Sequence, residues 1–221
     1  MSSNEKALVL LSGGQDSSTA LFWTKKEFKG VEAIGFNYGQ KHKLELDIAA
    51  NIAAIADIPY YIAEINTLPD ISKNALTSKL IEVEKDVKSQ GAPNTLVEGR
   101  NLLFITYAAI YAKQKEIKNL VLGVGQTDYS GYPDCRNDFI LSAKETICLA
   151  TDYNFEIHTP LMWKDKAETW KLADELGVFD LIRQKTLTCY NGLVADGCGA
   201  CPACILRKRG LDEYIRMKSD K

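Results

Sequence analysis

Apolar, β-rich runs alternate with segments of helical periodicity along most of the chain. The apolar runs predict strands at 7–11, 31–38, 60–65, 119–125 and 155–161. Between them, apolar residues recur at spacings of three and four, and this pattern predicts helices at 16–28, 41–56, 100–115, 136–151 and 165–176. Strands that alternate with helices in this way predict a parallel sheet.

The predicted strands are nearly continuous in apolar residues, which indicates that both faces of the sheet are buried. We therefore predict a doubly wound, Rossmann-like α/β fold, with ligands beyond the carboxyl ends of the strands. The segment 67–97 breaks the alternation, and its length predicts a substrate lid with one mobile helix. The tail is rich in cysteine and glycine and then basic, so we expect an α/β domain at 1–185 and a small module packed on it at 186–221.

Composition narrows the partners of the chain. A length of 221 residues with 46% hydrophobic content predicts one main domain. A net charge of −2 supplies no basic field for long nucleic acids, so small or nucleotide-sized ligands are expected instead. Apolar stretches shorter than a bilayer span and an amino terminus without signal-peptide features predict a cytoplasmic protein without a membrane segment. In that reducing compartment, the six cysteines favour thiol, catalytic or metal roles.

The stretch "LVLLSGGQDSSTALFW" at 8–23 combines a buried strand, a tight turn and the start of a helix. Unpaired amides at a helix amino terminus attract phosphate, and Gly13 and Gly14 allow the backbone to approach it closely. The hydroxyls of Ser12, Ser17 and Ser18 add donors. No lysine follows the glycines, which excludes the Walker motif of P-loop enzymes. The sequence therefore predicts a different kind of phosphate-binding loop.

"SGGQDS" after the first strand resembles the pyrophosphate-binding loop of the N-type ATP pyrophosphatases. The resemblance implies an adenine nucleotide alpha hydrolase-like fold that cleaves ATP between its α and β phosphates. Asp16 alone is equally well explained as a helix cap, and we expect it both to cap the helix and to orient pyrophosphate bound to Mg²⁺. The implied ATP-binding residues are Leu10, Leu11, Ser12, Gly13, Gly14, Gln15, Asp16, Ser17, Ser18, Thr19 and Ala20.

Four cysteines gather in "CYNGLVADGCGACPAC" near the carboxyl terminus: Cys189, Cys198, Cys201 and Cys204. Four thiolates at this spacing suit one tetrahedral Zn²⁺, and a closed shell of four sulfurs indicates a structural ion that pins the tail. Gly197 and Gly199 permit the tight turns that aim the sulfurs inward. An iron–sulfur cluster is the alternative. The other two cysteines, Cys135 and Cys148, are best explained as ordinary buried thiols, with Cys135 close to the expected pocket.

Six motifs together are similar to those of the 7-cyano-7-deazaguanine synthase family of queuosine biosynthesis. They are "LLSGGQDSSTA", "FNYGQKH", "VEGRN", "GVGQTDYSGYPDCR", "TPLMWKDKAETW" and the C-x8-C-x-x-C-x-x-C cluster, which span residues 8 to 204. The resemblance implies a ligase that uses ATP to convert 7-carboxy-7-deazaguanine and ammonia to the nitrile, through an adenylated carboxylate and an amide. It also implies a structural zinc and a homodimer.

The motifs propose roles for residues outside the loop. Arg100 is expected to grip a carboxylate or phosphate, with a surface ion pair to Glu98 as the alternative. Lys166 is expected to reach the ATP phosphates, with Lys164 as its competitor. Asp16, Arg100 and Lys166 are thus the predicted catalytic residues. The predicted substrate-binding residues are Tyr38, Gln40, Asn101, Asp128, Tyr132, Asp134 and Arg136. Asp128 and Asp134 would accept hydrogen bonds from the base, and Tyr129 or Tyr132 would stack on it.

Two other functions compete with this interpretation. A tRNA-modifying enzyme that inserts sulfur would combine a similar loop with paired cysteines, although it would need a broad basic surface. A non-catalytic zinc module could instead dock a protein partner through the helix predicted in "CILRKRGLDEYIRMK". For the synthase, the chain has no room for a glutaminase domain, so ammonia is expected from solution or from a partner. No direct contact with nucleic acid is expected.

Overall fold

The computed structural model describes residues 3–40, 44–65, 67–72, 74–77, 81, 94–127 and 132–220. Its centre is a five-stranded parallel sheet in the order β3-β2-β1-β4-β5. The strands are β1 (Ser3–Leu10), β2 (Phe28–Asn37), β3 (Tyr60–Glu64), β4 (Asn119–Val121) and β5 (Glu156–His158). The predicted parallel α/β sheet is confirmed, with all five strands where the apolar runs indicated them.

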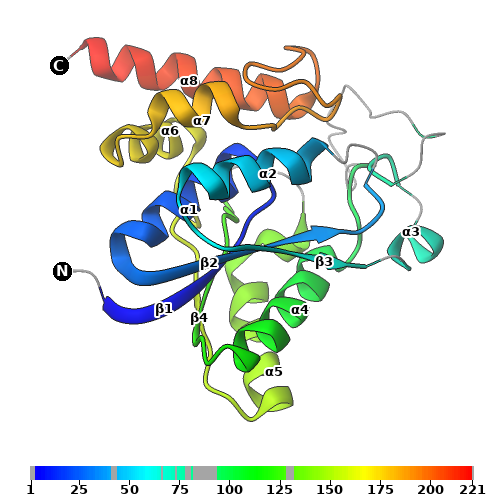
Figure 1. Ribbon diagram of the computed structural model, residues 1–221. Helices are drawn as coiled ribbons and strands as arrows, with labels where there is room; N and C mark the ends of the chain where they lie inside the picture. Colours follow the sequence, from blue (N-terminus) through cyan, green and yellow to red (C-terminus); the bar gives the residue numbers. More distant parts are fainter. Residues whose placement is uncertain are drawn as a thin grey trace.

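Helices cover both faces of the sheet, as a doubly wound fold requires (Figure 1). On one face, α1 (Gln15–Glu27) and α2 (Leu44–Ile55) pack on a core that includes Val9 and Val121. On the other face, α4 (Arg100–Gln114) and α5 (Asn137–Thr151) pack on a core that includes Leu8 and Leu120. Successive strand residues therefore point to opposite layers, which explains why the central part of β1, Ala7 to Leu10, is apolar at every position.

Strands β4 and β5 end earlier than the apolar pattern predicts. After Val121 the chain passes Gly123, where an added Cβ would lie only 2.7 Å from the backbone of Asp16. Gly123 therefore packs against the first turn of α1, while Leu122 and Val124 beside it pack in the core on the other face of the sheet. Short helices occupy two predicted loops, α3 (Leu68–Ile71) and η1 (Pro133–Cys135).

The predicted lid at 67–97 is only partly described. Its residues 73, 78–80 and 82–93 lie outside the described residues, as do Asp128 and Tyr129 of the predicted substrate site. The lid therefore stays a prediction. None of the described helices is both long and apolar enough to cross a bilayer.

The carboxyl-terminal part adds α6 (Lys166–Glu175), α7 (Phe179–Lys185) and the long helix α8 (Pro202–Ser219). Figure 1 shows α8 lying along α6 and α7, above the helices that cover the sheet. The three helices share a core of their own, composed of Ala167, Trp170, Ala173, Ile182, Leu211 and Tyr214. The division of the chain at residue 186 stays a prediction, and the packing of α8 on α6 crosses that boundary.

Candidate functional site

A cavity of about 750 Å³ opens beyond the carboxyl ends of β1, β2 and β4. Parallel sheets bind their ligands at this edge, and the volume lies in the upper part of the range for small-molecule sites. The structure brings most of the predicted residues to its wall. They are Leu10, Leu11, Ser12, Gly14, Gln15, Asp16, Ser17, Tyr38, Gln40, Arg100, Asn101, Tyr132 and Lys166, together with Lys164.

The SGGQDS loop is wedged between two neighbouring segments. Gly13 has a φ of +81°, and a Cβ there would lie 2.7 Å from the carbonyl oxygen of Glu45. On the other side, Gly123 meets the backbone of Asp16 and Ser17 just as closely. Only glycine fits at either contact, so the loop conformation is set by backbone packing on two sides.

Asp16 does not cap helix α1, so that part of the prediction is wrong. The N-cap is Gly14, which has no side chain to accept a hydrogen bond, and Asp16 is the second residue of the helix. Its carboxylate instead accepts hydrogen bonds from Lys166 Nζ, at 2.8 Å to Oδ1 and 2.7 Å to Oδ2. The first turn of α1 therefore holds one side of an ion pair that faces the cavity.

Lys166 is the first residue of α6, and its place is fixed by a capping box. Asp165 accepts a hydrogen bond from the Glu168 N–H at 2.8 Å, and Glu168 accepts one from the Asp165 N–H at 3.0 Å. The Lys166 side chain is largely buried. Its competitor Lys164 lines the cavity, but the carboxylate of Asp16 is bound by Lys166.

The hydroxyls of the loop differ in their surroundings. Ser12 and Ser17 form a pair with 3.0 Å between their oxygens, and Ser17 Oγ also accepts the N–H of Ser12 at 3.2 Å. Ser18 is fully buried, and no partner for its hydroxyl occurs among the described residues. Thr19 and Ala20 are also buried in α1, and Thr19 Oγ1 donates to the Gln15 carbonyl.

Arg100, the first residue of α4, points inward to the cavity. Its Nη1 donates to the hydroxyl of Tyr38 at 3.4 Å, and its guanidinium carbon lies 5.8 Å from the centre of the Tyr38 ring. Burial raises the pKa of Tyr38 from its ordinary value. Glu98, the partner in the alternative interpretation, instead accepts a hydrogen bond from Ser72 Oγ at 3.0 Å. The structure therefore favours a role for Arg100 in the cavity.

Asp134 and Asn101 join η1 to the first turn of α4. Asp134 Oδ2 accepts the backbone N–H of Asn101 at 3.0 Å, and Asn101 Nδ2 donates to the Asp134 carbonyl at the same distance. The thiol of Cys135 is next to them, and burial raises its pKa to about 11, so it stays protonated at neutral pH. Arg136 is exposed and is not part of the cavity wall.

The remaining predicted substrate residues meet different partners. Gln40 is turned back on its own strand, because it accepts the Tyr38 N–H at 2.9 Å and donates to the Phe36 carbonyl at 3.1 Å. Tyr132 joins three distant segments, with its hydroxyl 2.6 Å from that of Thr95 and 3.3 Å from that of Tyr190. Gln40 therefore supports Tyr38, while Tyr132 closes the cavity wall.

Glu45 is a cavity residue that the sequence analysis did not identify. It lies in the first turn of α2, and its burial raises the carboxyl pKa to about 7 although the nearby Arg100 lowers it. In the sequence it belongs to "KLELD" and is typical of a solvated helix face. The one feature of the sequence that could have identified Glu45 is its position after the second predicted strand, at the edge of the sheet where ligands bind.

Glu45→Gln is expected to remove a pH dependence of stability. The folded chain has a carboxyl pKa of about 7 against an ordinary 4.5, so it binds the proton more tightly than the unfolded chain. The free energy of unfolding therefore falls as pH rises between these values. Because glutamine does not titrate, the variant should gain stability over the wild type between pH 5 and pH 8, as measured by urea denaturation. A difference that is the same at both pH values would contradict this.

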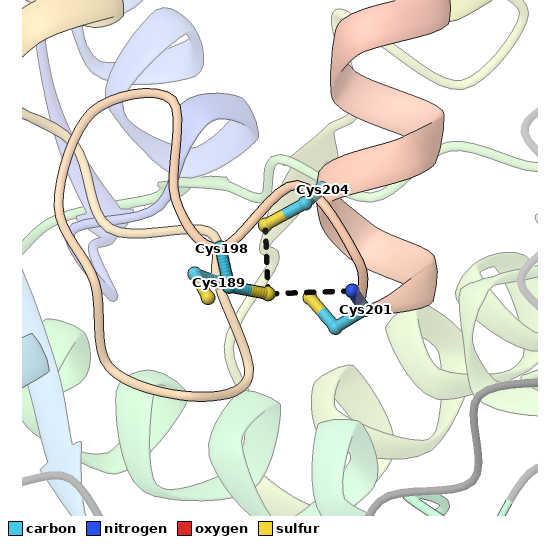
Figure 2. A group of neighbouring side chains, drawn as sticks. All are labelled: Cys189, Cys198, Cys201 and Cys204. Carbon is cyan, nitrogen blue, oxygen red and sulfur yellow. Dashed lines mark hydrogen bonds between the residues drawn. The ribbon is translucent and has the colours of Figure 1, made fainter.

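The four predicted cysteines converge at the amino terminus of α8 (Figure 2). Their sulfur atoms all lie within 4.8 Å of one another, and Sγ of Cys198 is 3.9 Å from Sγ of Cys204. Gly197 and Gly199 both have a φ of +69°, and a Cβ on Gly197 would lie 2.4 Å from the Cys204 sulfur. The predicted role of these glycines in the turns is thus confirmed.

The cluster fits one metal ion. A tetrahedral shell with metal–sulfur bonds of about 2.3 Å places its sulfurs about 3.8 Å apart, close to the separation of Cys198 and Cys204. A [4Fe–4S] cluster has each thiolate on a different iron, and a [2Fe–2S] cluster divides the four thiolates between two irons, so both place the cysteine sulfurs farther apart than a single ion does. Among the described residues, these cysteines form the one group of three or more metal-ligating side chains.

Comparison with known proteins agrees with this geometry. The family model "Queuosine biosynthesis protein QueC" matches residues 6–215. The 7-cyano-7-deazaguanine synthase of Clostridium botulinum is 55% identical over 210 residues, covering 95% of this chain and 96% of that one. That of Bacteroides fragilis is 55% identical over 216 residues, covering 98% and 99%.

Two solved structures are similar in fold. A 4-thiouridine synthetase in complex with RNA and bound ATP is 18% identical, with a TM-score of 0.54, and covers 98% of this chain and 53% of that one. The NMN synthetase of Francisella tularensis is also 18% identical, with a TM-score of 0.50 and coverages of 81% and 64%. These likenesses concern the fold alone, whereas the synthase relatives match nearly the whole chain. The chain therefore belongs to the family of 7-cyano-7-deazaguanine synthases, the ATP-dependent ligases of queuosine biosynthesis.

Proposed function

We propose that the SGGQDS loop, Lys166 and Arg100 carry out the ATP-dependent step of this ligase. The observation that carries the proposal is the ion pair of Asp16 and Lys166 at the amino terminus of α1, facing the cavity. The amides of the first turn of α1 and the Lys166 ammonium supply positive charge where the β and γ phosphates would lie. Leu10 to Ala20 form or support this subsite.

The carboxylate of 7-carboxy-7-deazaguanine is a poor electrophile, which explains the need for ATP. Attack of a carboxylate oxygen on the α phosphorus forms the acyl adenylate and breaks the bond to pyrophosphate. Arg100, inside the cavity, is suited to hold the carboxylate or the α phosphate through two parallel hydrogen bonds. Mg²⁺ would be held mainly by the phosphates, with Asp16 as the protein ligand, and would neutralise their charge.

Ammonia then attacks the activated carbonyl carbon, AMP leaves, and the amide forms. Conversion of the amide to the nitrile removes its oxygen, and a second ATP can activate that oxygen at the same site. Both activation steps need a pocket that excludes water, since water would hydrolyse the adenylate. Tyr38, Asn101, Tyr132 and Asp134 are the described residues that we propose around the base. Asp128 lies outside the described residues, Gln40 supports Tyr38, and Arg136 is exposed outside the cavity wall.

We propose that the four-cysteine cluster holds one structural Zn²⁺ per chain. Four thiolates leave no open position for water or substrate, so this ion would stabilise the fold and take no part in the reaction. The close spacing of the sulfurs supports zinc over an iron–sulfur cluster.

We also propose that the chain forms a homodimer. Exposed apolar side chains on α4 and α5 support a second copy on that face, above all Ile110, Leu141 and Leu149, which are 54%, 57% and 82% exposed. Sedimentation velocity measures the state directly, and a single species with the mass of one chain would contradict the proposal. Ammonia would reach the site from solution or from a partner enzyme.

Mass spectrometry of the products tests the whole proposal. Purified protein is mixed with ATP, Mg²⁺, ammonium and 7-carboxy-7-deazaguanine, and the nitrile with AMP is expected. Formation of AMP without nitrile would show an active loop with a different acceptor. Absence of both would refute the assignment of the loop.

A further inference from the structure

We infer that Thr188 and Arg207 are positioning residues for ATP, because they hold the first turn of α1 against the segment that leads into the four-cysteine cluster. The inference rests on the ATP site proposed at residues 10–20. It assigns the carboxyl-terminal module a second task beyond securing the end of the chain. Neither side chain needs to touch ATP for this task.

The segment before Cys189 is hydrogen-bonded to the loop at two points. The Leu187 N–H donates to the Gly13 carbonyl at 2.9 Å, and Thr188 Oγ1 accepts the Gln15 N–H at 3.2 Å. Gln15 is the first residue of α1, so its N–H has no partner within the helix. Thr188 thereby fixes the direction of the helix amino terminus. The next residue, Cys189, belongs to the four-cysteine cluster.

Arg207 holds Thr188 from α8. The side chain is only 3% exposed, and its Nη1 donates to Thr188 Oγ1 at 3.0 Å and to Thr186 Oγ1 at 2.9 Å. Its Nη2 donates to the carbonyls of Ile182 and Arg183, each at 3.0 Å. All four acceptors are neutral, and no carboxylate lies within ion-pairing distance in the described part of the chain.

Arg207 is buried without a direct ion pair, although the charges of Asp16 and Asp196 act on it from a distance, and its four hydrogen bonds to neutral acceptors offset part of the cost of burial. Burial lowers the pKa of Arg207 to about 10, and it therefore stays charged at neutral pH. Its guanidinium also lies 4.9 Å from the centre of the Trp170 ring, in the core shared by α6 and α8. Only the planar fork of arginine reaches these acceptors and stacks on the ring at once.

The same face of α8 also places Lys166. Cys204, Arg207 and Gly210 follow one another at three-residue spacing and so point to one side of the helix. A Cβ on Gly210 would lie 2.3 Å from Cβ of Lys166, so α8 approaches the start of α6 as closely as the backbones allow. One face of α8 therefore contributes Cys204 to the four-cysteine cluster, binds Thr188 through Arg207, and contacts Lys166 at Gly210.

Binding of α,β-methylene-ATP with Mg²⁺, measured by calorimetry on the zinc-loaded dimer, tests the inference. Thr188→Val keeps the shape of the side chain but leaves the Gln15 N–H unpaired, and it should weaken binding about tenfold. Thr188→Ser should restore binding. Thr186→Val is the matched control, since Thr186 also binds Arg207 but does not touch the loop. It should lower thermal stability and leave binding unchanged, with one zinc per chain in every variant.

Three outcomes separate the inference from the proposed function. The inference would be overturned if Thr188→Val bound the analogue as tightly as the wild type does. It would also be overturned if Thr186→Val weakened analogue binding as much as Thr188→Val does. Lys166→Gln tests the ATP site itself: if it binds the analogue unchanged, the proposed site is wrong. Should Thr188→Val not fold, Thr188→Ala takes its place, because it removes the same hydroxyl without placing a methyl group against the loop.

Discussion

Asp16→Asn is expected to lower kcat/KM for nitrile formation by about a thousandfold while the folded chain persists. The amide keeps the shape of the side chain but carries no charge. It should bind the Lys166 ammonium more weakly than the carboxylate does, and it should be a poorer ligand for the Mg²⁺ that we propose at Asp16. The Asp16 side chain is 36% exposed but its partner Lys166 is only 10% exposed, so loss of the carboxylate charge should lower thermal stability without unfolding the chain. Steady-state kinetics and thermal denaturation together measure the two effects.

The chain offers a matched control for this variant. Asp174, near the end of α6, accepts a hydrogen bond from Lys218 at 2.6 Å and is 32% exposed, similar to Asp16. Its pair with Lys218 joins α6 to α8 away from the cavity. Asp174→Asn should therefore leave kcat/KM nearly unchanged. A comparable loss of activity in both variants would mean that Asp16 acts only through the packing of α6.

Features whose residues lie close together along the chain were predictable from the sequence. The apolar runs located all five strands, and the alternation of strands with helices predicted the parallel sheet and its binding edge. The SGGQDS loop and the four cysteines were recognisable because their residues lie within short stretches whose chemistry depends on spacing. Each of these signals requires no knowledge of what packs against the stretch.

Features that depend on long-range contacts were harder to predict. Asp16 was expected to cap α1, because aspartate at the start of a helix commonly does so. The residue that engages it is Lys166, 150 positions further along the chain. The sequence around the SGGQDS turn does not indicate that Gly14, rather than Asp16, is the N-cap of α1. The sequence identified both residues as functional candidates but not as partners of each other.

Glu45, Thr188 and Arg207 illustrate the same limit. Each belongs to a stretch whose pattern has an ordinary explanation: a solvated helix face, a residue beside a cysteine, and a basic helix. Their importance arises from the cavity and from α8, which crosses α6 at Gly210. A glycine inside a helix was the one local signal of that close approach.

Cys201→Ala is expected to release the metal and to unfold at least α8, with a fall in thermal stability much larger than that of Asp16→Asn. Cys201 is the N-cap of α8 and a member of the cluster, so its loss removes both a ligand and the fixed start of the helix. The core that α8 shares with α6 through Trp170 and Leu211 would then lose one side. Zinc content and circular dichroism measure the two effects.

Cys148→Ala is the control, because this thiol lies on α5 far from the cluster in sequence and is not among the four converging sulfurs. It should keep one zinc per chain. If Cys201→Ala kept its zinc and its helix content, the cluster would not be the metal site. If Asp16→Asn unfolded the chain as far as Cys201→Ala does, chemistry and stability would not be divided between loop and cluster. The contrast is expected because the metal that we propose would hold α8, and α8 in turn would position the loop proposed to bind ATP.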